Sequence, residues 1–225
     1  MQAIMETVFD IIYLTTVITL GIIMIKKSKG KKEFLLFGIM AITLGAGDAF
    51  HLVPRAYALC TTGLADFTEA LGIGKFITSI TMTLFYVLLY YVWRSRYKIC
   101  NKHGYTAAIY GLALLRILLC LCPNNMWTSE NAGLSWAIYR NIPFALMGIM
   151  VIVLFFVEAK KNKDVAYKYM WLTIVLSFAF YIPVVLYADA MPLVGALMVP
   201  KTCAYVWTIL IGYMDMKKEL AKESK

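Results

Sequence analysis

Seven runs of apolar residues constrain this chain more than any motif does. Each run holds about 20 residues, the length that an α-helix needs to cross a hydrocarbon core about 30 Å thick. Only short connections separate the runs, so we predict one all-α, polytopic transmembrane domain over residues 1–225, a seven-helix bundle. The predicted spans are Val8–Ile25, Phe34–Val53, Leu71–Trp93, Tyr105–Cys122, Trp136–Val157, Tyr169–Tyr187 and Met191–Tyr213.

The composition agrees with a membrane protein. Of the 225 residues, 61% are hydrophobic and 16% are charged, whereas soluble domains average about 45–50% and about 25%. The first apolar run has neither a basic segment before it nor a small-residue cleavage site after it. We therefore interpret it as a retained span and not as a signal peptide.

Lysine and arginine occur on alternate connections. Seventeen of the 22 fall in segments 26–33, 94–104, 158–168 and 215–225, and the other connections hold none. Because cytoplasmic loops retain positive charge, we predict an N-terminus outside, a cytoplasmic C-terminus and a multi-pass location in the cell membrane. The net charge of +9 then reflects topology and attraction to anionic lipids, so no nucleic-acid partner is expected.

Ionisable residues within or at the ends of the spans are costly in a bilayer and therefore indicate partners, water or function. With the predicted orientation, most of them fall in the outer half, with Lys201 near the middle of its span. This distribution predicts a polar pocket that opens outward. The residues concerned are Asp10, Asp48, His51, Arg55, Lys75, Arg116, Arg140 and Lys201.

Helical spacing supports two faces of this pocket. Asp48, His51 and Arg55 lie three and seven residues apart, and Lys201, Tyr205 and Thr208 lie four and seven apart, so each set shares one helix face. In the first span, only Asp10 and its near neighbours are expected to contribute. The alternatives are a purely structural buried network, and extension of the long arginine side chains to the interface.

Cations exceed carboxylates within the spans. Lys75, Arg116, Arg140 and Lys201 face only Asp10 and Asp48. The missing counter-charge points to an anionic ligand: a phosphate, a carboxylate or a lipid headgroup. The predicted ligand-binding residues are Asp10, Arg116, Arg140, Lys201, Tyr205 and Tyr181.

Three prolines are predicted to interrupt late spans: Pro143, Pro183 and Pro200. Each removes a backbone donor and frees a carbonyl one turn earlier, which must be satisfied by protein or water within a bilayer. Either these are plain kinks, or the freed carbonyls line a cavity or hinge.

Metal or cofactor chemistry is not expected. The two histidines are too few for a catalytic zinc site, and the chain has no HExxH, GxSxG, P-loop or GxGxxG motif. The five cysteines lack metal-ligand spacing. Cys60 is predicted either to pair with Cys120 or Cys122 or, like the others, to pack as a small apolar residue.

Two glycine-rich segments resemble membrane lipid enzymes. GAGDAFHLVP (45–54) and GIGKF (72–76) are similar to motifs of the lysoplasmalogenase-like family, a resemblance that makes Asp48 a membrane carboxylate of the site. That family's late Ser-Asp pair meets Ser177 and Phe178 here.

The same segments also resemble the alkaline-ceramidase and adiponectin-receptor superfamily of seven-span hydrolases. His51 matches the histidine of its Ser-x-x-x-His element, with Gly47 in place of the serine, and its late pair of histidines is absent. Together the two resemblances imply that Asp48 and His51 are catalytic.

A third resemblance is to microbial rhodopsins, which share the seven-span topology and carry retinal on a lysine of span 7. Lys201 occupies such a position, and Asp48 or Asp10 would be its counterion. Three function classes therefore stay open: a transporter, a membrane-embedded lipid enzyme, and a receptor, sensor or retinal-type photoreceptor. A homo-oligomer also stays open.

Overall fold

The computed structural model describes residues 2–129, 133–188 and 190–223, and no strand occurs among them. Seven helices are long and apolar enough to cross a membrane, which confirms the predicted seven-helix architecture. Three short 3-10 helices lie in the connections: η1 (Ala65–Phe67), η2 (Pro123–Asn125) and η3 (Pro192–Leu197). The long helices are α1 (Gln2–Lys27), α2 (Lys32–Cys60), α3 (Thr68–Arg96), α4 (His103–Leu121), α5 (Leu134–Lys161), α6 (Met170–Tyr187) and α7 (Met198–Glu223).

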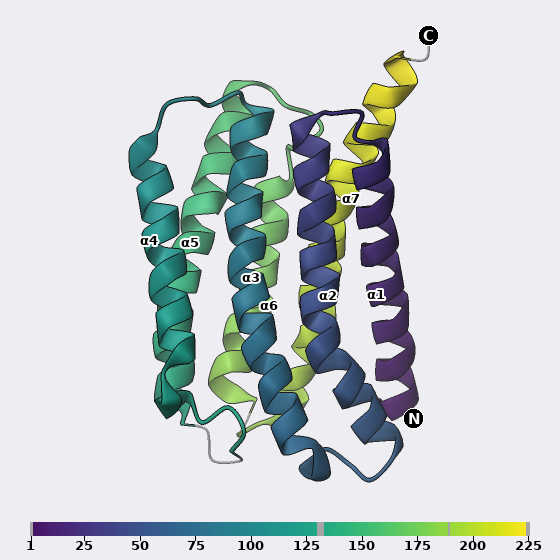
Figure 1. The fold of residues 1–225 in the computed structure, drawn as a ribbon, viewed down its shortest axis with the longest axis vertical. Coiled ribbons are helices and arrows are strands. Elements are labelled where there is room, and N and C mark those ends of the chain that lie inside the picture. Colours follow the sequence, from purple (N-terminus) through teal and green to yellow (C-terminus); the bar gives the residue numbers. More distant parts are fainter. Residues whose placement is uncertain (1, 130–132, 189, 224–225) are drawn as a thin grey trace.

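The helices form a bundle in which sequence neighbours pack side by side (Figure 1). Helices α1 and α2 also contact α7, and α3 contacts α5. The first and last helices are thereby joined, and side chains from distant parts of the chain meet in the interior.

The helices differ from the predicted spans mainly at their ends. Helix α2 continues through Pro54 to Cys60, because hydropathy marks the apolar part of a helix and not its polar extension. Helix α7 begins only at Met198, after the 3-10 turn of η3. Lys201 therefore lies in the first turn of α7 and not near the middle of a span, as the apolar run suggested.

The prolines do not act alike. Pro143 and Pro183 lie inside α5 and α6, where each removes one helical hydrogen bond. Pro200 lies in the first turn of α7, where backbone N–H groups have no partner within the helix in any case. The expectation that Pro200 frees a helical carbonyl is therefore wrong.

Aromatic rings fill much of the interior between α3, α5, α6 and α7. The Tyr86 ring lies 4.9 Å from that of Phe144 and 5.6 Å from that of Phe178, measured between centroids. Phe85 and Tyr205 meet edge to face at 5.5 Å. Such edge-to-face pairs are favourable contacts between rings, and the Phe85–Tyr205 pair packs α3 against α7, the helix that carries Lys201.

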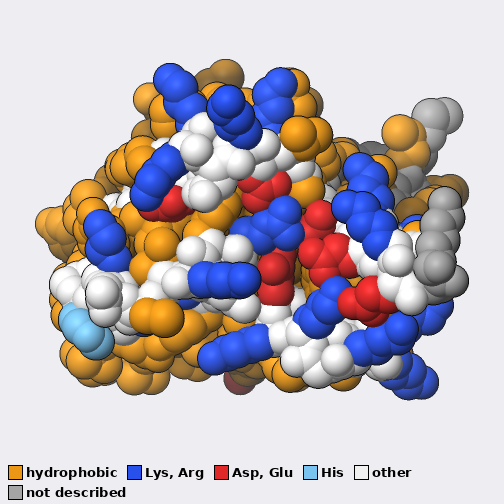
Figure 2. All heavy atoms as spheres, turned by 90° about the horizontal axis from the view of Figure 1, so that it is seen from above, with side chains coloured by type: hydrophobic (Ala, Val, Ile, Leu, Met, Phe, Trp, Pro, Cys, Tyr) orange, Lys and Arg blue, Asp and Glu red, His pale blue; other side chains and the backbone are white. Residues whose placement is uncertain are grey.

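The four lysine- and arginine-bearing segments all lie at one end of the bundle (Figure 1). Seen from that end, acidic side chains gather near the middle with basic side chains around them (Figure 2). The centre of this group is Arg96 of α3. Its guanidinium lies 2.8 Å from Asp164, 2.7 Å from Asp215 and 3.4 Å from Glu33.

The Arg96 cluster joins four parts of the chain, because its carboxylates come from α2, α7 and the α5–α6 connection. Tyr167 covers the Arg96 guanidinium at 4.3 Å and donates a hydrogen bond to Glu33. Burial opposes ionisation of Asp164, but hydrogen bonds and charge from Arg96 hold the pKa of this carboxyl below its ordinary value. The sequence prediction counted these residues only as loop charges and missed the cluster.

Candidate functional site

Asp48 of α2 is the buried carboxylate of the bundle interior. It is 8% exposed, and the hydroxyl of Tyr13 on α1 donates a 2.7 Å hydrogen bond to its Oδ2. Only Asp10 and its near neighbours were expected to contribute from α1, and Tyr13, three residues after Asp10, is the α1 residue that hydrogen-bonds Asp48.

Lys201 points into the bundle, where it is buried together with Tyr205 and Thr208 of the same face. Its Nζ lies 4.9 Å from the centroid of the Tyr181 ring and 5.3 Å from that of Tyr205. Asp48 and Arg116 are close enough to interact with it electrostatically. Among the described residues, however, no carboxylate forms an ion pair with it.

Arg116 of α4 is the least satisfied charge in the interior. It is 2% exposed, and its guanidinium carbon lies 3.4 Å from the centroid of the Phe144 ring. Its Nε and Nη1 have no hydrogen-bond partner. A buried guanidinium with unmade hydrogen bonds carries a desolvation cost that its surroundings do not offset.

Arg140 of α5 is engaged differently from Arg116. Its Nη1 donates a 2.8 Å hydrogen bond to Asn125 Oδ1, and its guanidinium lies 4.2 Å from the centroid of a Trp127 ring. Asn125 in turn donates to the carbonyls of Leu119 and Cys122 at the end of α4. Arg140 thus holds the α4–α5 connection against α5, which is a structural role.

Asp10, His51 and Arg55 lie nearer the end of the bundle that carries the N-terminus. Arg55 hydrogen-bonds Glu6 of α1 at 3.0 and 3.2 Å, so it does not extend freely to an interface. Asp10 is half-buried and interacts electrostatically with Glu6 and Arg55. His51 Nδ1 is buried without a hydrogen-bond partner, and no described hydrogen bond joins His51 to Asp48.

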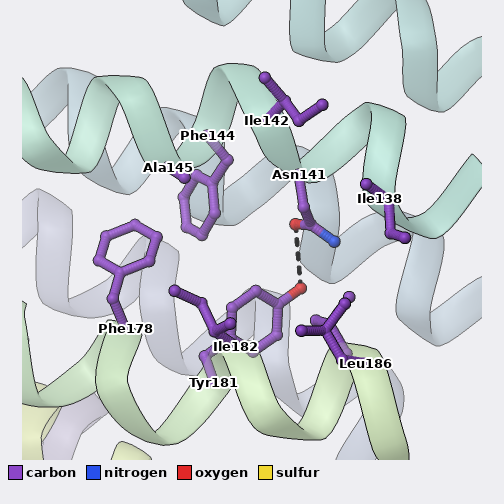
Figure 3. Close-up of a pocket in the computed structure, with 10 residues that line it drawn as sticks. Ile138, Asn141, Ile142, Phe144, Ala145, Phe178, Tyr181, Ile182 and Leu186 are labelled. Carbon is purple, nitrogen blue, oxygen red and sulfur yellow. Dashed lines mark hydrogen bonds between the residues drawn. The ribbon is translucent and has the colours of Figure 1, made fainter.

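An apolar groove of about 210 Å³ lies between α5 and α6, beside the buried cations. Phe144 and Tyr181 belong to its wall, and Asn141 accepts a 3.1 Å hydrogen bond from the Tyr181 hydroxyl, which bridges the two helices (Figure 3). The remaining lining residues are Ile138, Ile142, Ala145, Phe178, Ile182, Val185 and Leu186.

The two rings of this wall are the rings that contact the cations. The Phe144 ring contacts the Arg116 guanidinium, and the Tyr181 ring contacts the Lys201 ammonium group. Of these four residues, the sequence prediction missed Phe144, and it also missed Asn141. Neither could be found from the sequence, because each looks like an ordinary residue of an apolar span.

The glycines of the two resembling segments have packing roles. A Cβ on Gly74 of α3 would lie 2.3 Å from the Phe50 carbonyl oxygen of α2, and one on Gly47 would lie 2.0 Å from the Thr81 hydroxyl. Both distances are far shorter than van der Waals contact allows. Close approach of α2 and α3 therefore accounts for these glycines without any catalytic role.

The described residues contain no cluster of three or more His, Cys, Asp or Glu side chains suited to a metal ion. All five cysteines are free thiols, so Cys60 is not paired with Cys120 or Cys122. Cys60 instead lies 3.6 Å from the Thr7 hydroxyl of α1.

Comparison with known proteins identifies no relative, since no family model, no curated protein and no solved structure matches this chain. The central feature of the site is a pair of buried cations, Arg116 and Lys201, close to the buried carboxylate Asp48.

Proposed function

We propose that this chain is a multi-pass membrane protein that binds an anionic ligand within its helix bundle and carries it across the bilayer. Arg116 and Lys201 bind the anion, and Asp48, held by Tyr13, positions Lys201. The N-terminus lies outside, so the site is nearer the outer face. The observation that carries the proposal is Arg116, a buried guanidinium with two nitrogens lacking partners.

Charge balance supports this reading. Asp48 already accepts a hydrogen bond from Tyr13, and it interacts electrostatically with Lys201. One carboxylate cannot neutralise two cations, and uncompensated charge in a low-dielectric interior costs several kcal/mol. A carboxylate or phosphate ligand placed between Arg116 and Lys201 supplies both the missing charge and acceptors for the guanidinium.

A lipid enzyme is the second candidate, and the unpartnered Nδ1 of His51 favours it. A histidine with one free ring nitrogen can act as a general base. However, Asp48 hydrogen-bonds Tyr13 and not His51, so no Asp-His pair supports the imidazole. The balance of contacts therefore favours binding of an anion over hydrolysis.

Thermal unfolding of the purified protein tests the proposal. Acetate, inorganic phosphate, octanoate and octyl phosphate are added at equal ionic strength, with chloride as reference. We expect at least one of these anions to raise the melting temperature above the chloride value. Arg116→Gln should remove that increase, whereas Lys217→Gln, a change to an exposed lysine, should keep it. No anion-specific increase, or an increase that survives Arg116→Gln, would refute the proposal.

Proteoliposomes then separate the two candidates. A transporter accumulates the stabilising anion and loses this uptake in Arg116→Gln, while His51→Ala retains it. A lipid hydrolase would instead release fatty acid from the vesicle lipids and lose that release in His51→Ala.

A further inference from the structure

We propose that the groove between α5 and α6 is the lateral entrance and acyl-chain site for a single-chain amphiphile, whose anionic head is bound by Arg116 and Lys201. The head is a carboxylate or a phosphate monoester. This inference rests on the proposed function and names the class of its ligand. It also assigns a role to the groove that anion binding by itself does not require.

The lining of the groove fits an acyl chain and not a free anion. Eight of its ten residues have hydrocarbon side chains, and the only polar ones, Asn141 and Tyr181, hydrogen-bond each other. Ile142 and Ile182 are about half exposed, so the groove is open on the side of the bundle that faces lipid. A chain lying there would therefore be in contact with the bilayer along its length.

Two aromatic rings form a partition between the groove and the buried cations. Phe144 and Tyr181 line the groove, and the charges of Arg116 and Lys201 lie against these same two rings. The thickness of one aromatic ring therefore separates the apolar site from each cation.

The partition is built so that it can open. Pro143 directly precedes Phe144 in α5, and Pro183 lies two residues after Tyr181 in α6. Each proline removes one helical hydrogen bond, which locally weakens its helix and favours bending. Only the Asn141–Tyr181 hydrogen bond joins polar groups across the groove. Breaking it and turning the Phe144 and Tyr181 rings admits the head to the cations.

Charge complementarity decides which amphiphile fits. A neutral lipid supplies no negative charge to offset Arg116 and Lys201, and a cationic one adds a third positive charge. A single chain is favoured because about 210 Å³ is below the about 300–1,000 Å³ of sites that enclose whole drug-sized ligands.

Photolabelling of the full chain in phosphatidylcholine nanodiscs tests this site. The probes are palmitic acid and hexadecanol, each with a diazirine at mid-chain. We expect the acid to label α5 and α6 peptides that contain the groove about tenfold more than the alcohol does, the ratio that one charge-assisted contact supports. Ala145→Trp, which fills the groove, and Arg116→Gln should each reduce acid labelling to the level of the alcohol.

Val153→Trp is the matched control, because this residue lies on the same helix, is about half exposed and is outside the groove. It should label like the unmodified protein. If Ala145→Trp does not fold, Ile182→Trp replaces it, since this side chain lines the groove yet already faces lipid.

The outcomes separate this inference from the proposed function. Equal labelling by acid and alcohol, or equal labelling of Ala145→Trp and Val153→Trp, overturns the groove site. If acetate or inorganic phosphate still stabilises the protein in an Arg116-dependent manner, anion binding stands and only the amphiphile is wrong. If Arg116→Gln retains both acid labelling and anion stabilisation, both proposals fail.

Discussion

The guanidinium of Arg116 lies 3.4 Å from the centroid of the Phe144 ring, and two of its three nitrogens have no hydrogen-bond partner. An aromatic face is thus the main contact of a buried cation. Such a contact contributes about 2 kcal/mol when desolvated, less than the several kcal/mol that burial of an ion costs. The residue is therefore expected to reduce the stability of the ligand-free protein.

Arg116→Met should stabilise the ligand-free protein. Methionine keeps apolar contact with Phe144 and removes the buried charge, and replacing buried ions by apolar residues of similar size yields about 1–4 kcal/mol in favourable cases. The measurement is the free energy of unfolding in detergent without added anion. A clear loss of stability in Arg116→Met would mean that the charge already has a partner in the resting protein.

Asp48→Ala should have the opposite effect. It leaves Lys201 without its carboxylate and Tyr13 without its acceptor, at a cost of about 3–5 kcal/mol by analogy with buried pairs that lose one partner. Tyr13→Phe removes only one hydrogen bond to a charged group and should cost about 1.5–3 kcal/mol. Asp66→Ala, at an exposed position in η1, is the control. If the melting temperature of Asp66→Ala falls as far as that of Asp48→Ala, the buried contacts of Asp48 do not stabilise the fold.

Asp164 should make stability depend on pH in the acidic range. Its pKa in the folded protein lies below the ordinary value because Arg96 outweighs the effect of burial. The folded state thus binds this proton more weakly than the unfolded state does. The stabilisation is present above the unfolded-state pKa of about 3.9 and is lost as the pH falls through the lower folded-state value.

The comparison with Asp164→Asn isolates this effect. We expect the variant to melt at a lower temperature than the unmodified protein at pH 7, and the difference to shrink as the pH falls below about 3.9. Asp66→Asn provides the control for a carboxyl without this contact. A difference in melting temperature that stays constant down to acidic pH would show that the negative charge of Asp164 does not stabilise the fold through Arg96.

The fold was predictable because each apolar run contains its own evidence for a spanning helix. The inward orientation of Asp48 and Lys201 followed in the same way from local spacing. Contacts between distant segments were not predictable: Tyr13 with Asp48, Phe144 with Arg116, and Arg96 with its three carboxylates. Such pairs are set by the packing of helices, about which hydropathy and charge counts contain no information.

The position of Lys201 shows a second limit. The run Met191–Tyr213 is uniformly apolar at its start, so hydropathy treats it as one span. The chain instead forms a 3-10 helix over Pro192–Leu197 before α7 begins. Hydropathy depends on composition alone, so it does not distinguish a 3-10 helix followed by an α-helix from one continuous α-helix. A lysine expected at mid-span consequently lies in a first helical turn.

Accessibility to an impermeant maleimide should reveal the orientation of the bundle. In a background without native thiols, Lys163→Cys at the basic end should be shielded in intact cells, and Asn124→Cys in η2 should be labelled. Both positions are exposed in the structure, so membrane sidedness decides the result. Ser28, also at the basic end, is unsuitable because it is buried. Labelling of Lys163→Cys alone would reverse the orientation and with it the outward position of the site.

Lys201 allows anion binding to be separated from the retinal alternative, because the two uses need different properties of its side chain. Anion binding needs a positive charge near Arg116, whereas a Schiff base needs a primary amine. Lys201→Arg keeps the charge and removes the amine, and Lys201→Met removes both while keeping most of the apolar stem.

We expect Lys201→Arg to retain anion-dependent stabilisation and Lys201→Met to lose it, with both variants folded, since the stem still packs against Tyr181 and Tyr205. All-trans retinal added to the unmodified protein should produce no absorption band to the red of free retinal. A red-shifted band that disappears in Lys201→Arg would establish the amine as the functional group. Asp48, the carboxylate that interacts with Lys201, would then be the counterion of a pigment, and Arg116 would lose its proposed role in binding an anion.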